Sequence, residues 1–435
     1  MVGMKILRIT AVSLFLLFCF MLRFPYYAHG ESIYTLKQLA SQGNAAAESN
    51  LGYAYFYGKG VPLNYAKAVY WFRLSAAQGN AHGEAQLGTS YVLGKGVPLN
   101  YAKAVYWFRL SAMQGFAHAE YDLGYAYEHG KGVPKDYSLA VYWYRFSALQ
   151  GDSSGEADLS YAYLYGYGVA KNLTKAAYWS NLSAKQENLL GIIMSILVSR
   201  TRKANADYNL ALEYEGGLNG KKISVSKSEY WYKKAATLGN ASAEAIVGDN
   251  YYYGVGISRN YAKALHWYKL AAEQDDSGAE ESLGLMYYYG NGVPQNYSKA
   301  AYWYKKAAKL GDYVAEERLG YFYYWGEGVP RDYAKTVYWY KKAAKLDYDV
   351  AESRLGDLYR LGYGVSRDYA KAAQWYKKAA NFGYAGAEEG LGSLYQHGYG
   401  VSKDCAKALY WYKKAALQGN YSAKLKLAGV TKNSC

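Results

Sequence analysis

The segment N-Y-S-K-A-A-Y-W-Y-K-K-A-A-K-L-G, residues 296–311, decides the fold, because versions of it recur along most of the chain. Its fixed point is Trp303, and ten of the eleven tryptophans hold the equivalent place, 36 residues apart except for one step of 52. The ten are Trp71, Trp107, Trp143, Trp179, Trp231, Trp267, Trp303, Trp339, Trp375 and Trp411. A constant period of this length is typical of stacked repeats, each too small to bury its own apolar face. The sequence therefore predicts an array of about ten repeats.

Each repeat has the pattern of two helices joined by a short connector. An N-cap residue such as Asn296 stands seven positions before each of these tryptophans, and apolar positions follow at the spacing of one buried helical face. A glycine such as Gly292 precedes the second helix, and we expect it to end the first helix in the left-handed conformation. We expect Trp303 to be buried between repeats and Gly284 to let two helix backbones approach. The predicted fold is an all-α solenoid, an α/α superhelix of 36-residue helix-turn-helix repeats.

The repeat pattern also predicts the domain organisation. A leader at residues 1–30 precedes an N-terminal cap helix at 31–44, four repeats at 45–186, an apolar and basic insertion at 187–203, six repeats at 204–418 and a C-terminal cap at 419–435. The insertion holds the run L-L-G-I-I-M-S-I-L-V, which is too short to span a membrane. We expect it to extend the preceding helix or to form an extra helix on the stack; contact with a membrane surface or a partner is the alternative.

The leader has the features of a secretory signal. Lys5 and Arg8 precede an apolar run of 12 residues, and small residues follow near position 30. An uncleaved membrane anchor is the alternative, although a spanning helix needs about 20 apolar residues. We expect an exported protein, periplasmic or extracellular in a bacterium and in the lumen of the endoplasmic reticulum or secreted in a eukaryote. No membrane span is expected once the leader is cleaved.

The charge of the chain points to acidic partners. The net charge of +15 becomes +12 once Lys5, Arg8 and Arg23 leave with the leader. An exported protein meets no nucleic acid in its ordinary life, so a protein or peptide, an acidic one above all, or an anionic envelope glycan is the expected partner. Cys405 replaces a tyrosine of the repeat pattern, which predicts a buried free thiol.

The full motif, A-x-A-E-x-x-L-G-x-x-Y-x-x-G-x-G-V-x-x-D-Y-x-K-A-x-x-W-Y-K-K-A-A-x-x-G, is nearly complete between Ala315 and Ala344. It resembles the Sel-one-like repeat (SLR), a relative of the tetratricopeptide repeat, over residues 45–418. The resemblance implies a superhelical adaptor, acting in bacterial envelope function, signalling or host-cell interaction, or in degradation complexes of the eukaryotic endoplasmic reticulum. The fifth repeat and the insertion depart from the pattern, and the paired cysteines of one extracellular bacterial branch are absent.

No set of residues points to catalysis, a cofactor or a metal. Ser224 and Lys227 fit the S-x-x-K of serine acyl enzymes, but Ser224 is an N-cap and the companion motifs are absent. The histidines lack a second ligand one helical turn away. A recurring glutamate such as Glu316 stands in the first turn of the first helix, where the helix dipole favours it. We predict that the chain is not an enzyme.

The candidate binding residues are aromatic side chains beside the core stripe of the first helix, where the residue type varies between repeats. Since folding does not dictate these positions, the row is predicted to form a groove for a peptide; packing between repeats is the alternative. The candidates are Tyr57, Tyr125, Tyr161, Tyr165, Tyr253, Tyr289, Tyr321 and Trp325. The predicted function is an exported scaffold that binds a segment of another protein. A peptidoglycan- or glycan-binding envelope module, an enzyme regulator and an adaptor of the endoplasmic-reticulum lumen are the alternatives.

Overall fold

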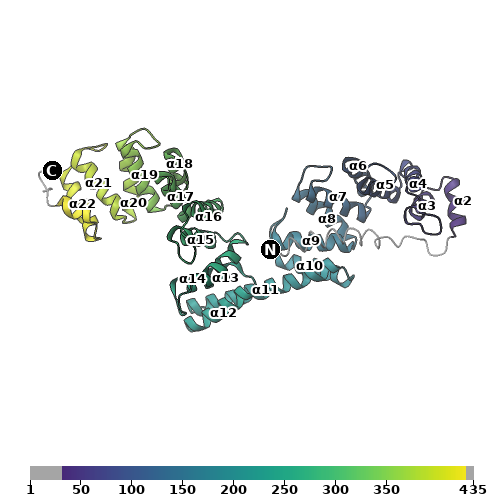
Figure 1. The fold of residues 1–435 in the computed structure, drawn as a ribbon, viewed down its shortest axis with the longest axis horizontal. Helices are drawn as coiled ribbons and strands as arrows, with labels where there is room; N and C mark the ends of the chain where they lie inside the picture. Colours follow the sequence, from purple (N-terminus) through teal and green to yellow (C-terminus); the bar gives the residue numbers. More distant parts are fainter. Residues whose placement is uncertain (1–31, 428–435) are drawn as a thin grey trace. The chain divides into compact units, whose positions relative to one another are not determined.

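The computed structural model describes residues 32–427, and within them every regular element is an α-helix, which confirms the predicted all-α solenoid (Figure 1). The chain divides into two compact parts, Met1–Lys203 and Ala204–Cys435, called the N-terminal array and the C-terminal array below. The predicted leader and the end of the predicted C-terminal cap lie outside the described residues.

Within its described residues, the N-terminal array holds one single helix followed by four helix pairs. Its helices are α2 (Ile33–Ser41), α3 (Ala45–Tyr57), α4 (Tyr65–Ala77), α5 (Ala81–Leu93), α6 (Tyr101–Met113), α7 (Ala117–His129), α8 (Tyr137–Leu149), α9 (Ser153–Tyr165) and α10 (Leu173–Lys185). The next helix, α11 (Leu189–Gly216), crosses into the C-terminal array. We number the pairs as repeats from α3 and α4 onward and call their members helix A and helix B.

The C-terminal array continues the same pairing. Its helices are α12 (Val225–Thr237), α13 (Ala241–Tyr253), α14 (Tyr261–Ala272), α15 (Ser277–Tyr289), α16 (Tyr297–Lys309), α17 (Tyr313–Trp325), α18 (Tyr333–Ala344), α19 (Asp349–Leu361), α20 (Tyr369–Asn381), α21 (Ala385–His397), α22 (Cys405–Leu417) and α23 (Tyr421–Leu427). Repeat 5 is the end of α11 with α12, and repeats 6 to 10 are the pairs from α13 to α22. From α12 to α23, each helix packs on the next one along the chain.

Helix B begins as predicted in nine of the ten repeats. The Asn or Asp at the N-cap accepts a hydrogen bond from the first helical turn; Asn296 Oδ1, for example, accepts from Lys299 N at 2.8 Å. The exception is Ser224, whose side chain makes no capping hydrogen bond to α12. The start of helix B is therefore fixed by one local interaction that the sequence already displays.

The glycine that ends helix A is not the one predicted. Gly290, with a φ of 75°, is the left-handed C-cap of α15, and Gly292 follows with a φ of 71°. A Cβ added to Gly292 would lie 2.6 Å from the Cβ of Tyr261 in the preceding helix B. The second glycine is thus required where the connector passes close to the previous repeat.

Tyr304, not Trp303, is the most deeply buried aromatic residue of its helix. Its side chain has 0% exposure, and a Cβ on Gly284 would lie 2.6 Å from its ring, so this glycine admits a ring rather than a second backbone. Trp303 and its nine equivalents are only half-buried. One residue turns a helix by about 100°, so Tyr304 points at its own helix A while Trp303 lies at the margin of the core between α14 and α15.

The recurring glutamate of helix A is buried, which the helix dipole alone does not explain. All nine examples are exposed by 4% or less. In repeats 1 to 4, 6 and 10 a glutamine 30 residues later donates to it, as Gln186 Nε2 does to Glu156 at 3.0 Å. In repeats 7 and 8 a helix B lysine pairs with the glutamate in place of the glutamine, and Lys342 Nζ lies 2.9 Å from Glu316. Repeat 10 has both partners. A hydrogen bond or ion pair across the helix pair therefore holds eight of the nine carboxylates, while Glu352 of repeat 9 has only the charge of Lys378 nearby.

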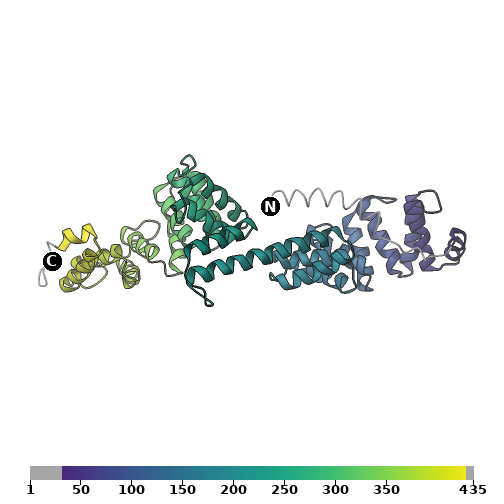
Figure 2. The ribbon, with the colours of Figure 1, turned by 90° about the horizontal axis from the view of Figure 1, so that it is seen from below.

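The apolar insertion is part of one 28-residue helix, α11, drawn in teal in Figure 2. Its first half supplies Met194 and Val198 to the core of the N-terminal array, and its last part supplies Ala211 to the core of the C-terminal array. The insertion thus extends the helix A that follows it, and not the helix B before it. None of the helices described is both long enough and apolar enough to cross a bilayer.

The prediction of a free thiol at Cys405 is wrong. Its sulfur is in a disulfide. Cys405 is the first residue of α22 and is half-buried. This place in the repeat is open to solvent, since Tyr297 at the start of α16 is 37% exposed.

Candidate binding site

The predicted aromatic row lies on helix A, and its members differ in exposure. In the N-terminal array all four candidates are half-buried: Tyr57 on α3, Tyr125 on α7, and Tyr161 and Tyr165 on α9. Tyr161 and Tyr165 pack on each other with ring centroids 4.6 Å apart. These four residues are therefore partly open to solvent.

The row of the C-terminal array is more open. The exposed fractions are 63% for Tyr253, 58% for Tyr289 and 53% for Trp325, whereas Tyr321 is half-buried against Trp325 with centroids 6.3 Å apart. Three large rings thus stand in solvent on consecutive helices A. Single exposed apolar residues are ordinary, but Trp and Tyr are enriched among the residues that dominate binding energy.

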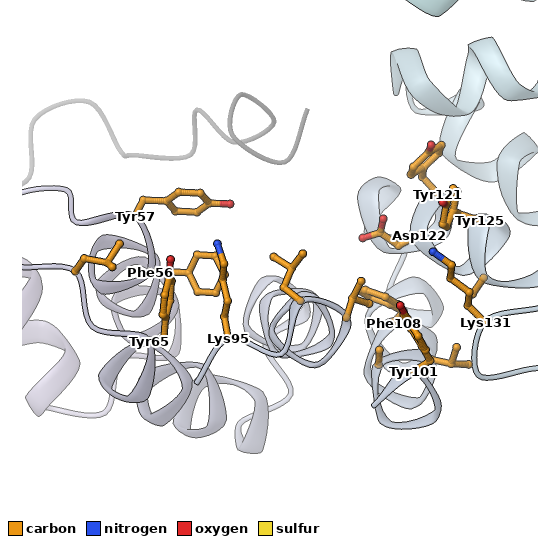
Figure 3. Close-up of a pocket in the computed structure, with 16 residues that line it drawn as sticks. Phe56, Tyr57, Tyr65, Lys95, Tyr101, Phe108, Tyr121, Asp122, Tyr125 and Lys131 are labelled. Atoms are coloured by element: carbon orange, nitrogen blue, oxygen red, sulfur yellow. The ribbon is translucent and has the colours of Figure 1, made fainter. Parts of the chain in front are cut away.

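A cavity of about 480 Å³ lies in the N-terminal array, walled by α3, the start of α4, α5, α6, α7 and their connectors (Figure 3). Of the predicted row, Tyr57 and Tyr125 line it and Tyr161 and Tyr165 do not. Its remaining apolar walls are Phe56, Leu63, Val92, Leu93, Ala104, Val105, Phe108 and Ala126. A volume between about 300 and 1,000 Å³ with mostly apolar walls is typical of a ligand site.

The cavity exists because repeat 2 carries shorter side chains than repeat 1. Val92 and Leu93 of α5 stand 36 residues after Phe56 and Tyr57 of α3. Because α5 lacks the two aromatic rings that α3 carries, space remains beside α5. Phe56 and Tyr57 bound this space on one side, and Tyr125 of α7 bounds it on the other (Figure 3). The gap in the aromatic row is thus what makes the hollow.

Two lysines and one carboxylate give the cavity its charge. Lys95 Nζ lies 4.9 Å from the ring centroid of Tyr65, and Lys131 Nζ lies 5.1 Å from that of Tyr125, both at cation–π distance. Asp122 of α7 is the one acidic residue of the lining. Figure 3 shows Lys95 and Lys131 at opposite walls of the cavity. The charge balance of the lining is therefore basic.

The hydroxyls of Tyr57 and Tyr253 are neutral at physiological pH, because the pKa of each is raised. Burial raises the pKa of Tyr57 above its ordinary value, and the neighbouring Tyr53 and Tyr65 raise it further. Burial likewise raises the pKa of Tyr253. These groups can donate or accept hydrogen bonds, but they are not nucleophiles.

Buried tyrosines of helix B bond to acidic side chains of helix A. Tyr268 donates to Asp249 at 2.7 Å, and Tyr376 donates to Asp357 at 2.7 Å. Burial raises the pKa of Glu281 on α15 to about 7, and the charge of Asp312 adds to that effect. Asp249 and Asp357, which stand at one variable position of helix A, therefore act as hydrogen-bond acceptors for core tyrosines.

Sequence reasoning missed Lys95, Lys131 and Phe108 as site residues. A signal was present for the lysines, because the connectors of repeats 1 to 3 all contain G-K-G, centred on Lys59, Lys95 and Lys131. Phe108 gave none, since it is one of the regular core positions of helix B.

The serine and the lysine of the S-x-x-K motif each contact a different residue rather than each other. Ser224 Oγ lies 3.4 Å from Ser226 Oγ, whereas Lys227 Nζ lies over the ring of Tyr214 at 5.1 Å. His82 Nδ1 is within 2.7 Å of Ser49 Oγ, and His118 Nδ1 is 2.5 Å from Asp152 Oδ2. Within residues 32–427, no group of three His, Cys, Asp or Glu side chains is placed to hold a metal ion.

Paired helices repeated at a constant period place the protein in the class of α/α repeat scaffolds. The chain belongs to the Sel1 repeat family, because ten copies of that repeat match it. The copies cover residues 45–80, 81–116, 117–152, 153–188, 204–240, 241–276, 277–312, 314–348, 349–384 and 385–420. Residues 189–203, between the fourth and fifth copies, belong to α11.

Solved structures of two bacterial proteins are similar to this chain. One, described as a protective antigen present in uropathogenic Escherichia coli strains and displaying an SLR fold, is 31% identical; the match covers 92% of this chain and 90% of that one, with a TM-score of 0.48. A Sel1 repeat protein from Oxalobacter formigenes is 26% identical, with coverage of 84% and 91% and a TM-score of 0.38. Among curated proteins, no sequence matches this chain significantly.

Proposed function

We propose that this protein is an exported scaffold that holds a segment of another protein against the helix A row. Membership of the Sel1 repeat family and the solenoid architecture support a role in protein–protein interaction. The observation that carries the proposal is the row itself, since Tyr253, Tyr289 and Trp325 are each more than half exposed. Large rings with their faces in solvent supply contact area at a low cost in side-chain entropy.

The place of action is part of the proposal. The leader at residues 1–30 supports export, and the family resemblance supports envelope function, signalling or interaction with a host cell. The scaffold acts without catalysis, and if its partner is an enzyme it acts as a regulator. An extended segment laid across several repeats would gain affinity from many modest contacts rather than from one deep site.

A glycan- or peptidoglycan-binding module is the second candidate. The exposed rings of Tyr253, Tyr289 and Trp325 also favour this function, because flat aromatic faces stack on sugar rings. The two candidates assign different ligands to the same side chains. The same pair of variants is therefore tested with both ligands.

Affinity capture from an envelope extract tests the proposal. The test variant carries Tyr253→Ser, Tyr289→Ser and Trp325→Ser. The matched control carries Tyr302→Ser, Tyr338→Ser and Tyr410→Ser, which remove helix B tyrosines of equal exposure, between 55% and 58%. All six side chains are exposed, so both variants should keep the helical circular dichroism spectrum of the wild type.

We expect the wild type and the control to retain the same proteins, and the test variant to retain at least tenfold less of them. The second candidate would be favoured if the wild type captured no protein but sedimented with purified cell wall, and if the test variant lost that sedimentation. Equal capture by the test variant and the control would contradict a role for the row.

A further inference from the structure

We infer that the cavity of the N-terminal array binds an acidic segment of a partner protein, anchored by one large apolar side chain. This inference rests on the proposed function, and it adds the place of one binding site and the chemistry of the segment. The site is the cavity between α3, α5, α6 and α7 described above.

The shape of the cavity selects the anchor. Phe56, Val92, Leu93, Val105 and Phe108 give it apolar walls, and about 480 Å³ is ample for one aromatic or branched aliphatic side chain with part of its backbone. An apolar side chain that fills such a hollow is desolvated on all sides, which is the usual setting of a binding hot spot. The anchor is therefore a residue such as Phe, Trp or Leu.

The charges at the walls select what flanks the anchor. Lys95 and Lys131 line the cavity, and they occupy the connector position at which repeat 1 also carries a lysine, Lys59, outside the lining. Later repeats carry tyrosine, valine, asparagine or glutamate there. Within residues 32–427, Lys95 and Lys131 take part in none of the ion pairs, and their ammonium groups lie over aromatic rings instead. Cations concentrated around one hollow attract a segment with carboxylates on both sides of its anchor.

The lining favours a protein segment over a glycan. A sugar carries many hydroxyls that each need a hydrogen-bond partner, whereas the lining offers no Asn, Gln, Ser or Thr side chain and a single carboxylate. Its polar groups are two ammonium groups, the carboxylate of Asp122 and the hydroxyls of tyrosines. Apolar depth with cations at the rim matches an acidic peptide better.

Two variants test the apolar and the charged halves of the inference separately. Leu93→Tyr fills the hollow with the residue that repeats 1 and 4 carry at the same place, Tyr57 and Tyr165, so the fold accommodates it. Its control is Leu361→Tyr, at the same place in repeat 9, with 38% exposure and outside the cavity. Lys95→Glu with Lys131→Glu reverses the charge, and Lys305→Glu with Lys309→Glu, exposed lysines of α16, is its control.

The experiment is selection of a phage-displayed library of random dodecapeptides on the purified protein, followed by fluorescence anisotropy titration of the most enriched peptide. We expect enriched peptides to combine a large apolar residue with flanking Asp or Glu. Leu93→Tyr and the charge-reversal variant should each weaken binding about tenfold or more, while both controls bind like the wild type. Binding should also weaken with added salt.

The inference would be overturned by no enrichment, by enrichment without an acidic bias, or by equal binding of the cavity variants and their controls. The same holds if an anionic polysaccharide, and no peptide, binds in a manner that Leu93→Tyr abolishes. Failure here is distinguishable from failure of the proposed function. Envelope proteins captured equally by Leu93→Tyr and wild type would leave the scaffold standing and remove only this site.

Discussion

At the scale of single residues, the buried glutamate of helix A has different surroundings in different repeats. Burial raises the pKa of Glu156 from an ordinary value of 4.5 to about 6, and the charge of Asp152 raises it while the bond from Gln186 lowers it. An acid with a raised folded-state pKa binds its proton more tightly in the folded than in the unfolded chain. Its contribution to stability is therefore present below about pH 4.5 and is lost as the pH rises to about 6.

We predict that Glu156→Gln removes this loss. The amide keeps an oxygen for the bond from Gln186 Nε2, which is 3.0 Å long in the wild type, and it carries no charge to desolvate. The free energy of unfolding at pH 7 should rise by up to about 2 kcal/mol, and its fall between about pH 4.5 and 6 should flatten. Urea unfolding followed by circular dichroism at several pH values measures both effects.

Glu388→Gln is the matched control, and it should have the opposite sign. Glu388 is fully buried and lies 3.0 Å from Lys414 Nζ, so the neutral amide loses an ion pair. Stability at pH 7 should fall by about 1–2 kcal/mol. Equal effects of the two substitutions would show that the partner of the carboxylate does not matter.

A second residue-scale prediction concerns the buried tyrosines of helix B. The hydroxyl of Tyr304 has no hydrogen-bond partner among the described residues, and repeats 1 and 2 already carry Phe72 and Phe108 at this place. Tyr304→Phe should therefore leave stability unchanged or raise it by up to about 1 kcal/mol. Tyr268→Phe should lower it by about 1–3 kcal/mol, because Asp249 loses its 2.7 Å bond.

Urea midpoints of the two variants, measured side by side, check this difference. Hydrogen exchange of α13 and α14 against α15 and α16 shows whether each change acts within its own repeat. Equal destabilisation by both substitutions would mean that the Tyr304 hydroxyl has a partner in solution.

At the scale of the element, helix A is shaped by the rings that pack on it. A Cβ at Gly284 would lie 2.6 Å from the ring of Tyr304, while one at Gly278 of the same helix would meet nothing nearer than Asp276 Oδ1 at 3.5 Å. Gly284→Ala should cost about 1–3 kcal/mol through overpacking. Gly278→Ala should stabilise by about 0.5–1 kcal/mol, because alanine loses less backbone entropy in a helix.

Thermal unfolding of the two α15 variants measures the contrast. If Gly284→Ala were as stable as Gly278→Ala, the ring of Tyr304 would have room to shift, and the close packing of the helix pair would be looser than described.

The helices could be predicted from sequence because their determinants are local. N-caps such as Asn296 and the regular apolar stripe lie within one helix and repeat ten times. Which of Trp303 and Tyr304 is more buried could not be predicted. A tryptophan at the same place in every repeat does not reveal whether its ring faces its own helix pair or the edge of the stack. Tyr304 varies to Phe and Ser in other repeats, yet it is the more buried of the two.

The cavity also escaped sequence reasoning, for a reason that belongs to packing. It is created by what Val92 and Leu93 lack, and that absence matters only because Tyr57 and Tyr125 stand on either side. The aromatic row was predicted residue by residue, but a hollow is a property of three neighbouring repeats at once. Its role in binding stays a prediction until the variants are measured.

At the scale of the whole molecule, α11 joins two arrays that each have their own core. Met194 and Val198 belong to one core, and Ala211 belongs to the other. We predict that Lys203→Pro, at an exposed position in the middle of this helix, disrupts α11 locally at a cost of about 3 kcal/mol or more. Hydrogen exchange should accelerate near residue 203, while α6 and α18 keep their protection.

Lys203→Ala is the control and should leave exchange unchanged, because alanine favours helix. Acceleration throughout both arrays in the proline variant would show instead that the chain unfolds as one cooperative unit.

The glutamate bonds have a consequence for how such a chain can change length over evolution. Eight of the nine buried carboxylates bond to a partner inside their own 36-residue repeat, so duplication or deletion of such a repeat moves both together. A crossover within a repeat is restricted. Repeat 1 has Leu74 where other repeats have the lysine, and repeat 7 has Leu310 where other repeats have the glutamine. A helix B that combined the two leucines would leave the buried carboxylate without either partner. Recombinants that survive selection should therefore break between the pairs, and the array should grow in whole, interchangeable units.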